Sequence, residues 1–329
     1  MKTVLPLIVI LGPTACGKTR LAVHLARRLG GEVISADSRQ VYRGMDIGTG
    51  KDLSEYFVDN EAIPYHLIDI LAAGAQYNVH QFQQDFQEVL TDIDARQKQP
   101  ILCGGTGLYI EAVLRNYQFT AIPVDETLRQ ALAQRTDDEL LTIFQNSPSA
   151  YTPMADTSTR KRLIRAIEIA HYLYQNPHLP NTQHAIRNTQ YAIPNAQYAT
   201  RNAQYLIFGL SLPVELRRER ITARLHERLQ NGMVEEVQQL LDSGLTPEQL
   251  VYYGLEYKFI TQYLTSEMDY DTMTTRLNVA IHQFAKRQMT YFRKMERDGL
   301  LIHWLDATKP TSDLVEDCLD ACKNAFLNL

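Results

Sequence analysis

The chain has few cysteines and no long apolar run, and both absences narrow the classes of protein to which it can belong. Its four cysteines among 329 residues give no disulfide framework. Cys318 and Cys322 are four residues apart without another Cys or His near them, so a semi-buried helix face explains them better than a metal site. No apolar run approaches the roughly 18 residues of a membrane helix, so we expect no membrane span. Residues 1–4 lead into an apolar run without a cleavage pattern, which favours a cytoplasmic protein.

The chain also lacks the positive net charge that is typical of nucleic-acid binders, since its formal charge is −5. Its cations nevertheless gather in groups along the sequence. The groups are Arg160, Lys161, Arg162 and Arg165; Arg217, Arg218, Arg220, Arg224 and Arg228; and Lys286, Arg287, Arg293, Lys294 and Arg297. A basic face on an acidic protein can bind phosphates, and a solvated helix surface is the alternative. The sequence leaves both interpretations open.

The most informative stretch matches the phosphate-binding loop pattern G-x-x-x-x-G-K-[ST]. Its residues are Gly12, Pro13, Thr14, Ala15, Cys16, Gly17, Lys18 and Thr19. An apolar strand-like run precedes it and a helix-patterned run follows it, so the backbone can fold around an anion at the positive end of a helix. Lys18 can reach the outer phosphates, and the Thr19 hydroxyl can ligate Mg²⁺. The pattern predicts a phosphate cradle rather than a glycine-containing surface turn.

Short apolar runs recur at strand length, and helical patterns separate the early ones. The runs are residues 5–11, 32–36, 66–71, 100–103, 206–210 and 300–305. This alternation predicts an α/β fold, a P-loop NTPase-like parallel sheet flanked by helices. We therefore expect a core built from residues 1–119 and 206–329, with further helices toward the C-terminus.

Residues 120–205 differ because they contain helical patterns, at 125–144 and 158–174, but no clear strand. We interpret them as a mainly helical insertion domain. Near its end, Asn, Gln and Tyr recur every seven residues between 188 and 205. Pro194 and the many amide side chains argue against a coiled coil, so about 186–205 is interpreted as a polar connector. The alternative is that its tyrosines stack on bases.

A second group of residues should lie beside the phosphate loop. Asp37 directly follows the strand-like run 32–36, and the carboxyl ends of parallel strands line the ligand crevice. Its carboxylate could ligate Mg²⁺ through water or accept a proton from a nucleophile, and a helix N-cap is the alternative. Two glycine-rich segments, 44–51 and 104–109, are expected at the same edge. Together they predict a phosphate-binding cleft with room for a second substrate.

A small-molecule kinase is the first alternative for such a cleft, but the chain lacks a clear Walker-B strand. The nearest candidate is the segment from His66 to Asp69, and more apolar residues follow it. No arginine-rich lid is evident either. These absences favour a loop that holds a diphosphate leaving group over one that holds a transferring phosphate. A non-catalytic RNA-binding protein with the same fold is a further alternative.

Several segments together resemble the bacterial tRNA dimethylallyltransferases, also called tRNA isopentenyltransferases. The segments are 12–19, 35–42, 44–49, 104–109, 162–168, 254–258 and 285–293, in the family's order and over most of the chain. The resemblance implies transfer of a dimethylallyl group from dimethylallyl diphosphate to N6 of the adenine next to the tRNA anticodon, at position 37. It also implies Mg²⁺ as cofactor and the anticodon stem-loop as partner, held by the helical insertion. Such proteins are commonly described as ATP-binding, and we expect a monomer.

The resemblance also implies roles for single residues. Asp37 would be the general base for N6, Thr19 would contact the diphosphate and Mg²⁺, and Arg220 and Arg224 would contact the second side of the diphosphate. The implied tRNA contacts are Asp37, Ser38, Arg39, Gln40, Thr106, Arg129, Lys161, Arg162, Leu163, Ile164 and Arg165. The chain departs from the family at Val214, where an Arg is frequent, and at Tyr291, where a Trp is usual.

Overall fold

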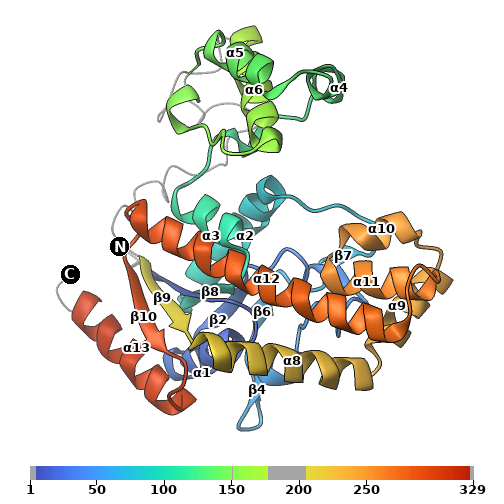
Figure 1. Cartoon of the computed structure of the whole chain (residues 1–329). Coiled ribbons are helices and arrows are strands. Elements are labelled where there is room, and N and C mark those ends of the chain that lie inside the picture. Colours follow the sequence, from blue (N-terminus) through green and yellow to red (C-terminus); the bar gives the residue numbers. More distant parts are fainter. Residues whose placement is uncertain (1–4, 150, 177–204, 327–329) are drawn as a thin grey trace. The chain divides into compact units, whose positions relative to one another are not determined.

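The computed structural model describes residues 5–149, 151–176 and 205–326 (Figure 1). Its centre is a six-stranded sheet in the order β10-β9-β1-β8-β2-β6, and each neighbouring pair is parallel. The strands are β1 (Leu7–Leu11), β2 (Glu32–Ser35), β6 (Tyr65–His66), β8 (Pro100–Gly104), β9 (Tyr205–Ser211) and β10 (Ile302–Asp306). Every residue of β1 and β8 is buried, as is usual for parallel strands covered on both faces. The predicted α/β fold with a parallel sheet is confirmed.

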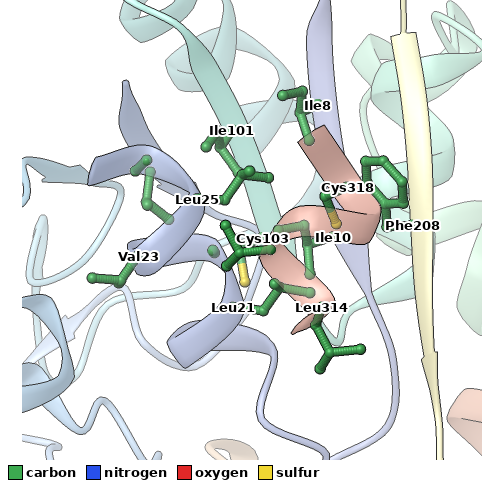
Figure 2. Close-up of a cluster of buried hydrophobic side chains, with 14 of the residues drawn as sticks. Ile8, Ile10, Leu21, Val23, Leu25, Ile101, Cys103, Phe208, Leu314 and Cys318 are labelled. Atoms are coloured by element: carbon green, nitrogen blue, oxygen red, sulfur yellow. The ribbon is translucent and has the colours of Figure 1, made fainter. Parts of the chain in front are cut away.

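The helices in the same part of the chain as this sheet are α1 (Lys18–Leu29), α2 (Val79–Ala95), α3 (Gly107–Leu114), α8 (Val214–Gln230), α9 (Met233–Asp242), α10 (Pro247–Tyr252), α11 (Leu255–Leu264), α12 (Tyr270–Arg297) and α13 (Thr311–Phe326). Helices α1, α2, α3 and α13 pack on the sheet, and further helices pack on one another beside it. The α1 helix packs against α13, and Figure 2 shows Leu21 of α1 in one cluster with Ile10 of β1 and Cys318 of α13. Cys318 and Cys322 are both buried in this core, which confirms that they belong to a packed helix face. None of the helices in the described ranges combines the length and apolar character needed to cross a membrane.

The apolar run at residues 66–71 is not one strand. The β6 strand covers only its first residue, and β7 (Leu71–Ala72) pairs with β3 (Tyr42–Arg43) in a separate small sheet. Between them, Leu67 and Asp69 have φ angles of 61° and 57°. A left-handed backbone cannot continue an extended strand, so the prediction of a single strand there is wrong.

The chain divides into two compact units, one of Met1–Leu114 with Ala203–Leu329 and one of Arg115–Asn202. The second unit contains α4 (Glu126–Ala133), α5 (Asp137–Gln145) and α6 (Arg160–Gln175). These helices enclose a small core of their own. Its buried members are Leu132, Leu140, Phe144, Leu163, Ala166 and Ile167. The unit begins and ends a few residues before the limits of 120 and 205 proposed for the insertion.

The helical pattern predicted over 125–144 is divided into α4 and α5. Thr136 is the N-cap of α5, where its hydroxyl accepts the N–H of Glu139 and the Glu139 carboxylate accepts the N–H of Thr136. This capping box starts a new helix because it satisfies two N–H groups that an uninterrupted helix would have paired internally. The connector predicted at about 186–205 lies outside the described residues, except for Tyr205, which is the first residue of β9.

One ion-pair network, centred on a buried glutamate, joins β2 to the end of α2. Glu32, the first residue of β2, is 3% exposed and accepts hydrogen bonds from both terminal nitrogens of Arg96. His66 Nε2 lies 2.7 Å from Glu32 Oε2. The hydrogen bonds from Arg96 are the main reason that the pKa of Glu32 lies below its ordinary value. Folding therefore favours the ionised form of this carboxyl group.

Replacing Arg96 with methionine is expected to lower the free energy of unfolding by about 2 kcal/mol at pH 7, because the buried carboxylate loses its main partner. The loss is smaller than for a fully buried pair because Arg96 is 40% exposed and solvent screens its charge. A lowered pKa contributes stability that is present above the unfolded value and is lost as the pH falls. The difference between the variant and the wild type should therefore begin to shrink below about pH 4.5, where Glu32 of the unfolded chain takes up a proton, and should keep shrinking as the pH falls through the lowered pKa of the folded wild type. Urea denaturation at pH 7 and pH 4 measures this. An equal loss at both pH values would contradict the assignment.

Candidate active site

The phosphate-loop sequence forms the turn between β1 and α1. Gly17 precedes the helix with a φ of 86°, and Ala15 is also left-handed, with a φ of 62°. Gly12 has no space for a side chain, because a Cβ there would lie 2.9 Å from Cys16 Sγ. Lys18 lies over the loop, and its Nζ donates to the Pro13 carbonyl at 2.8 Å. The turn thus curls around the first residues of α1, where unpaired N–H groups and the helix dipole favour an anion.

Asp37 lies beside this turn, as its position after β2 predicts. Asp37, Lys18 and Thr19 line the same cavity, which has a volume of about 320 Å³. The Asp37 carboxylate accepts the Arg39 N–H on Oδ1 at 2.9 Å, and its Oδ2 has no partner among the described residues. A turn rather than a helix follows Asp37, so the N-cap alternative is wrong. One oxygen of the carboxylate is therefore positioned by the backbone and the other is available to a ligand.

The glycine-rich loop after β8 supports the turn that carries Asp37. A Cβ at Gly104 would lie 2.2 Å from the Ala36 carbonyl oxygen, so only glycine allows this approach. Thr106 donates its N–H to the same carbonyl at 3.2 Å, and its Oγ1 accepts the Ser38 N–H at 3.1 Å. Thr106, which the resemblance assigned to tRNA, thus fixes both neighbours of Asp37 in this structure.

Gln288 on α12 joins two of the loops. Its Oε1 accepts the Thr14 N–H of the phosphate loop at 2.9 Å, and its Nε2 donates to the Gly105 carbonyl at 2.9 Å. Nearby, Tyr291 packs so closely on Gly107 that a Cβ there would lie 2.4 Å from its ring, and its hydroxyl donates to Glu111 at 2.6 Å. The tyrosine that replaces the usual Trp therefore forms part of the cavity wall.

Two arginines of α8, one helical turn apart, line another side of the cavity. Arg224 and Arg228 both pair with Asp52, and the Arg228 Nη2–Asp52 Oδ1 distance is 3.5 Å. Burial, together with the neighbouring Arg224 charge, lowers the pKa of Arg228. Arg220 is not among the cavity-lining residues, although it was predicted together with Arg224. Val214 is 44% exposed and does not line the cavity either.

Sequence reasoning missed several residues of the cavity wall as site residues. They are Arg228, Glu256, Arg287, Gln288 and Tyr291. For Arg228 the signal was its spacing of four residues from Arg224, which places both on one helix face. The other residues lie in the segments 254–258 and 285–293, which carried the family resemblance without assigned roles. Burial raises the pKa of Glu256, and the nearby arginine charges oppose that rise.

Asp69, the nearest candidate for a Walker-B aspartate, serves another purpose. Its carboxylate accepts a hydrogen bond from Lys51, whose side chain is 1% exposed. Lys51 Nζ also donates to the Tyr42 carbonyl at 2.6 Å and to Asp46 Oδ1 at 2.5 Å. Asp69 does not line the cavity. Its charge therefore neutralises a buried lysine that anchors the glycine-rich segment 44–51.

The remaining predicted tRNA contacts lie in the second unit and differ in exposure. Leu163 is buried in that unit's core, and Arg129 pairs with the buried Glu168 at 2.9 Å. Arg165 donates to the carbonyls of residues 122 and 123. Ile164 packs against the core, whereas Lys161 and Arg162 are exposed. Arg162 also pairs with Asp156 at 2.9 Å, so Lys161 and Arg162 share exposure but not the same freedom from partners, and their role in tRNA binding stays a prediction.

Comparison with known proteins agrees with this geometry. The family model described as IPP transferase matches residues 40–295. A tRNA dimethylallyltransferase of Porphyromonas gingivalis is 53% identical over 94% of this chain and 97% of its own length. One from Parabacteroides distasonis is 48% identical over 97% and 98%. The crystal structure of the tRNA isopentenylpyrophosphate transferase of Bacillus halodurans superposes with a TM-score of 0.68 at 29% identity, covering 97% of this chain and 96% of that one. The chain belongs to the IPP transferase family.

Proposed function

We propose that this protein transfers the dimethylallyl group of dimethylallyl diphosphate to N6 of the adenine next to the tRNA anticodon, at position 37. The observation that carries the proposal is that Asp37, with one free carboxylate oxygen, lines the same cavity as Lys18 and Thr19 of the phosphate loop. The names of its close relatives support this substrate pair. The same loop would accept the phosphates of ATP, so nucleotide binding is part of the proposal.

The cations around the cavity would stabilise the leaving group. In the reaction the allylic C1–O bond breaks and its electron pair goes to the diphosphate, while the N6 lone pair forms the new bond to C1. Adenine N6 is a weak nucleophile, so the C1–O bond must be largely broken before N6 attacks C1. Lys18 and the two arginines of α8 place positive charge where this negative charge develops, and such preorganised charge is the largest contribution in many enzymes.

Asp37 would take the proton that N6 loses as the new bond forms. Its free Oδ2 provides the acceptor, and the Arg39 N–H holds Oδ1 in place. The adenine must leave its stack to reach the cavity, which costs a few kcal/mol. Ser38, Arg39 and Gln40 follow Asp37 at the cavity wall and are proposed to contact this nucleotide. Closing the cavity around both substrates would keep water from the allylic cation.

Mg²⁺ fits the donors that the cavity offers. Among the described residues no group of three or more His, Cys, Asp or Glu side chains could hold a metal. Mg²⁺ is commonly held by one or two protein oxygens, waters and substrate phosphates, and the Thr19 hydroxyl supplies such an oxygen in the cavity. When bound there, Mg²⁺ would neutralise diphosphate charge. We further propose that the protein acts as a monomer in the cytoplasm.

Mass spectrometry of tRNA nucleosides tests the proposal. The protein is incubated with unmodified tRNA, dimethylallyl diphosphate and Mg²⁺, and N6-dimethylallyladenosine is the expected product. A parallel incubation with labelled ATP and small-molecule acceptors tests for a kinase. Phosphoryl transfer without tRNA, and no modified nucleoside, would overturn the proposed function.

The exposed cations of α6 give a further prediction. Replacing both Lys161 and Arg162 with alanine should weaken tRNA binding and reduce the slope of log K against log salt by about 1 to 2, since each lost phosphate contact contributes about 1. Binding titrations at several salt concentrations measure the slope. A matched control removes the same charge at Lys98 and Lys323, both exposed in the other unit. An unchanged slope in the α6 variant would mean that this cluster is solvated surface.

A further inference from the structure

The glycine-rich segment 44–51 is held by one carboxylate that comes from a distant part of the chain. Glu236 lies on α9, and its Oε2 accepts the N–H groups of Asp46 at 2.8 Å and Ile47 at 2.7 Å. Its Oε1 accepts the Gly48 N–H at 3.0 Å and the Tyr257 hydroxyl at 2.7 Å. Both oxygens are thus fully used, and consecutive N–H groups enclose the carboxylate as they would enclose a bound anion.

Tyr257, which donates its hydroxyl to Glu236, also packs closely on the glycine-rich segment. Tyr257 is on α11, which packs beside α9 (Figure 1), and its ring lies against Gly48. A Cβ at Gly48 would lie 2.7 Å from the ring, so glycine is needed for the approach. Hydrogen bonds to a charged group are stronger than those between neutral groups. The carboxylate therefore fixes the backbone of this segment more firmly than neutral contacts would.

The held segment reaches both sides of the cavity. Gly48, Thr49 and Gly50 line it, and the Gly50 carbonyl accepts Gln40 Nε2 at 3.1 Å. Two residues further on, Asp52 pairs with the α8 arginines. The segment thus contacts Gln40, on the side proposed for the nucleotide, and the arginines on the side proposed for the diphosphate.

We propose that Glu236 is a positioning residue for prenyl transfer, which acts by fixing segment 44–51 so that Gln40 and the α8 arginines keep their places. This inference rests on the proposed function and deepens it, since Glu236 touches neither reacting group. Removing the carboxylate would let segment 44–51 shift, and the residues that it contacts on both sides of the cavity would shift with it. A misplacement of about 1 Å far from the reacting atoms can reduce the rate by about 100-fold.

A set of three variants tests the proposal. Glu236→Gln keeps the shape but points an NH₂ group at N–H donors, Tyr257→Phe removes only the hydroxyl, and Glu235→Gln makes the same charge change on an exposed neighbour. We expect Glu236→Gln to lower kcat/KM by about 100-fold, through both kcat and the KM values of tRNA and dimethylallyl diphosphate. The kcat/KM of Tyr257→Phe should lie between the values of Glu236→Gln and the wild type, and that of Glu235→Gln should match the wild type. Glu236→Asp, which keeps the charge on a shorter side chain, should recover part of the loss.

Hydrogen exchange separates positioning from a general effect on stability. The amides of Asp46, Ile47 and Gly48 should exchange faster in Glu236→Gln while the amides of the central strands keep their protection. Faster exchange at these amides with unchanged kcat and KM values would overturn the proposal, as would loss of protection throughout the fold. If the wild type transfers no prenyl group, the proposed function fails. The positioning role of Glu236 is then tested by comparing the affinities of the wild type and Glu236→Gln for magnesium diphosphate. A Glu236→Gln variant that binds magnesium diphosphate as tightly as the wild type would overturn it, and weaker binding would support it.

Discussion

Replacing Asp37 with asparagine is expected to lower kcat for prenyl transfer by about 10³-fold, within the range that general-base catalysis contributes. Asparagine has the same shape and can still accept the Arg39 N–H on Oδ1, so the turn after β2 should keep its geometry. The substitution replaces the free Oδ2 with an NH₂ group, which cannot accept the N6 proton. The KM for dimethylallyl diphosphate should change little, because Lys18 and the α8 arginines remain.

Asp59→Asn is the matched control, because Asp59 is an exposed aspartate whose one surface ion pair contributes little. Single-turnover measurement of the modified nucleoside gives the rate of the chemical step without product release. A rate for Asp37→Asn within about threefold of the wild type would show that the proton leaves N6 by another route, because loss of a general base costs far more. Such a result would contradict the role assigned to Asp37.

Local rules explain why part of the site could be predicted from the sequence. The phosphate loop, the helix that begins at Lys18 and the placement of Asp37 each depend on residues that are neighbours in the chain. A strand before a G-x-x-x-x-G-K-[ST] pattern fixes the loop at the carboxyl edge of the sheet. Asp37 reaches the same edge because β2 runs in the same direction as β1. The three elements therefore lie at one edge of this sheet, where only β8 separates β1 from β2.

The rest of the site depends on contacts between distant segments. Gln288 is 274 residues from Thr14, and Glu236 is 190 residues from Asp46. No periodicity or motif reports which distant side chain will satisfy a particular loop N–H. The failed strand at 66–71 has the same origin, since the left-handed conformation of Asp69 accompanies its pairing with a buried lysine. By contrast, the break before α5 could have been found, because Thr136 and Glu139 have capping-box spacing.

Replacing Lys18 with methionine is the second change for which we expect a large loss. Methionine keeps the length of the stem and removes the charge, and the contact with the Pro13 carbonyl is lost with it. If Lys18 stabilises charge on the departing diphosphate, kcat should fall by about 100- to 1000-fold, the range for loss of one preorganised donor. Arg224→Met should cost less, because Arg228 faces the same cavity and can supply part of the charge.

Whether the loss of activity in Lys18→Met appears in kcat or in KM shows which state of the diphosphate Lys18 stabilises. An interaction made equally with bound substrate and with the transition state raises KM when it is removed, whereas one made only in the transition state lowers kcat. Because the diphosphate gains a full charge only as the C1–O bond breaks, we expect the loss in Lys18→Met to appear mainly in kcat. Lys98→Met serves as the control, because Lys98 is exposed and does not line the cavity. A variant with normal kcat and a raised KM would mean that Lys18 binds the ground-state diphosphate alone, and that the loop's N–H groups and the α8 arginines stabilise the leaving group without it.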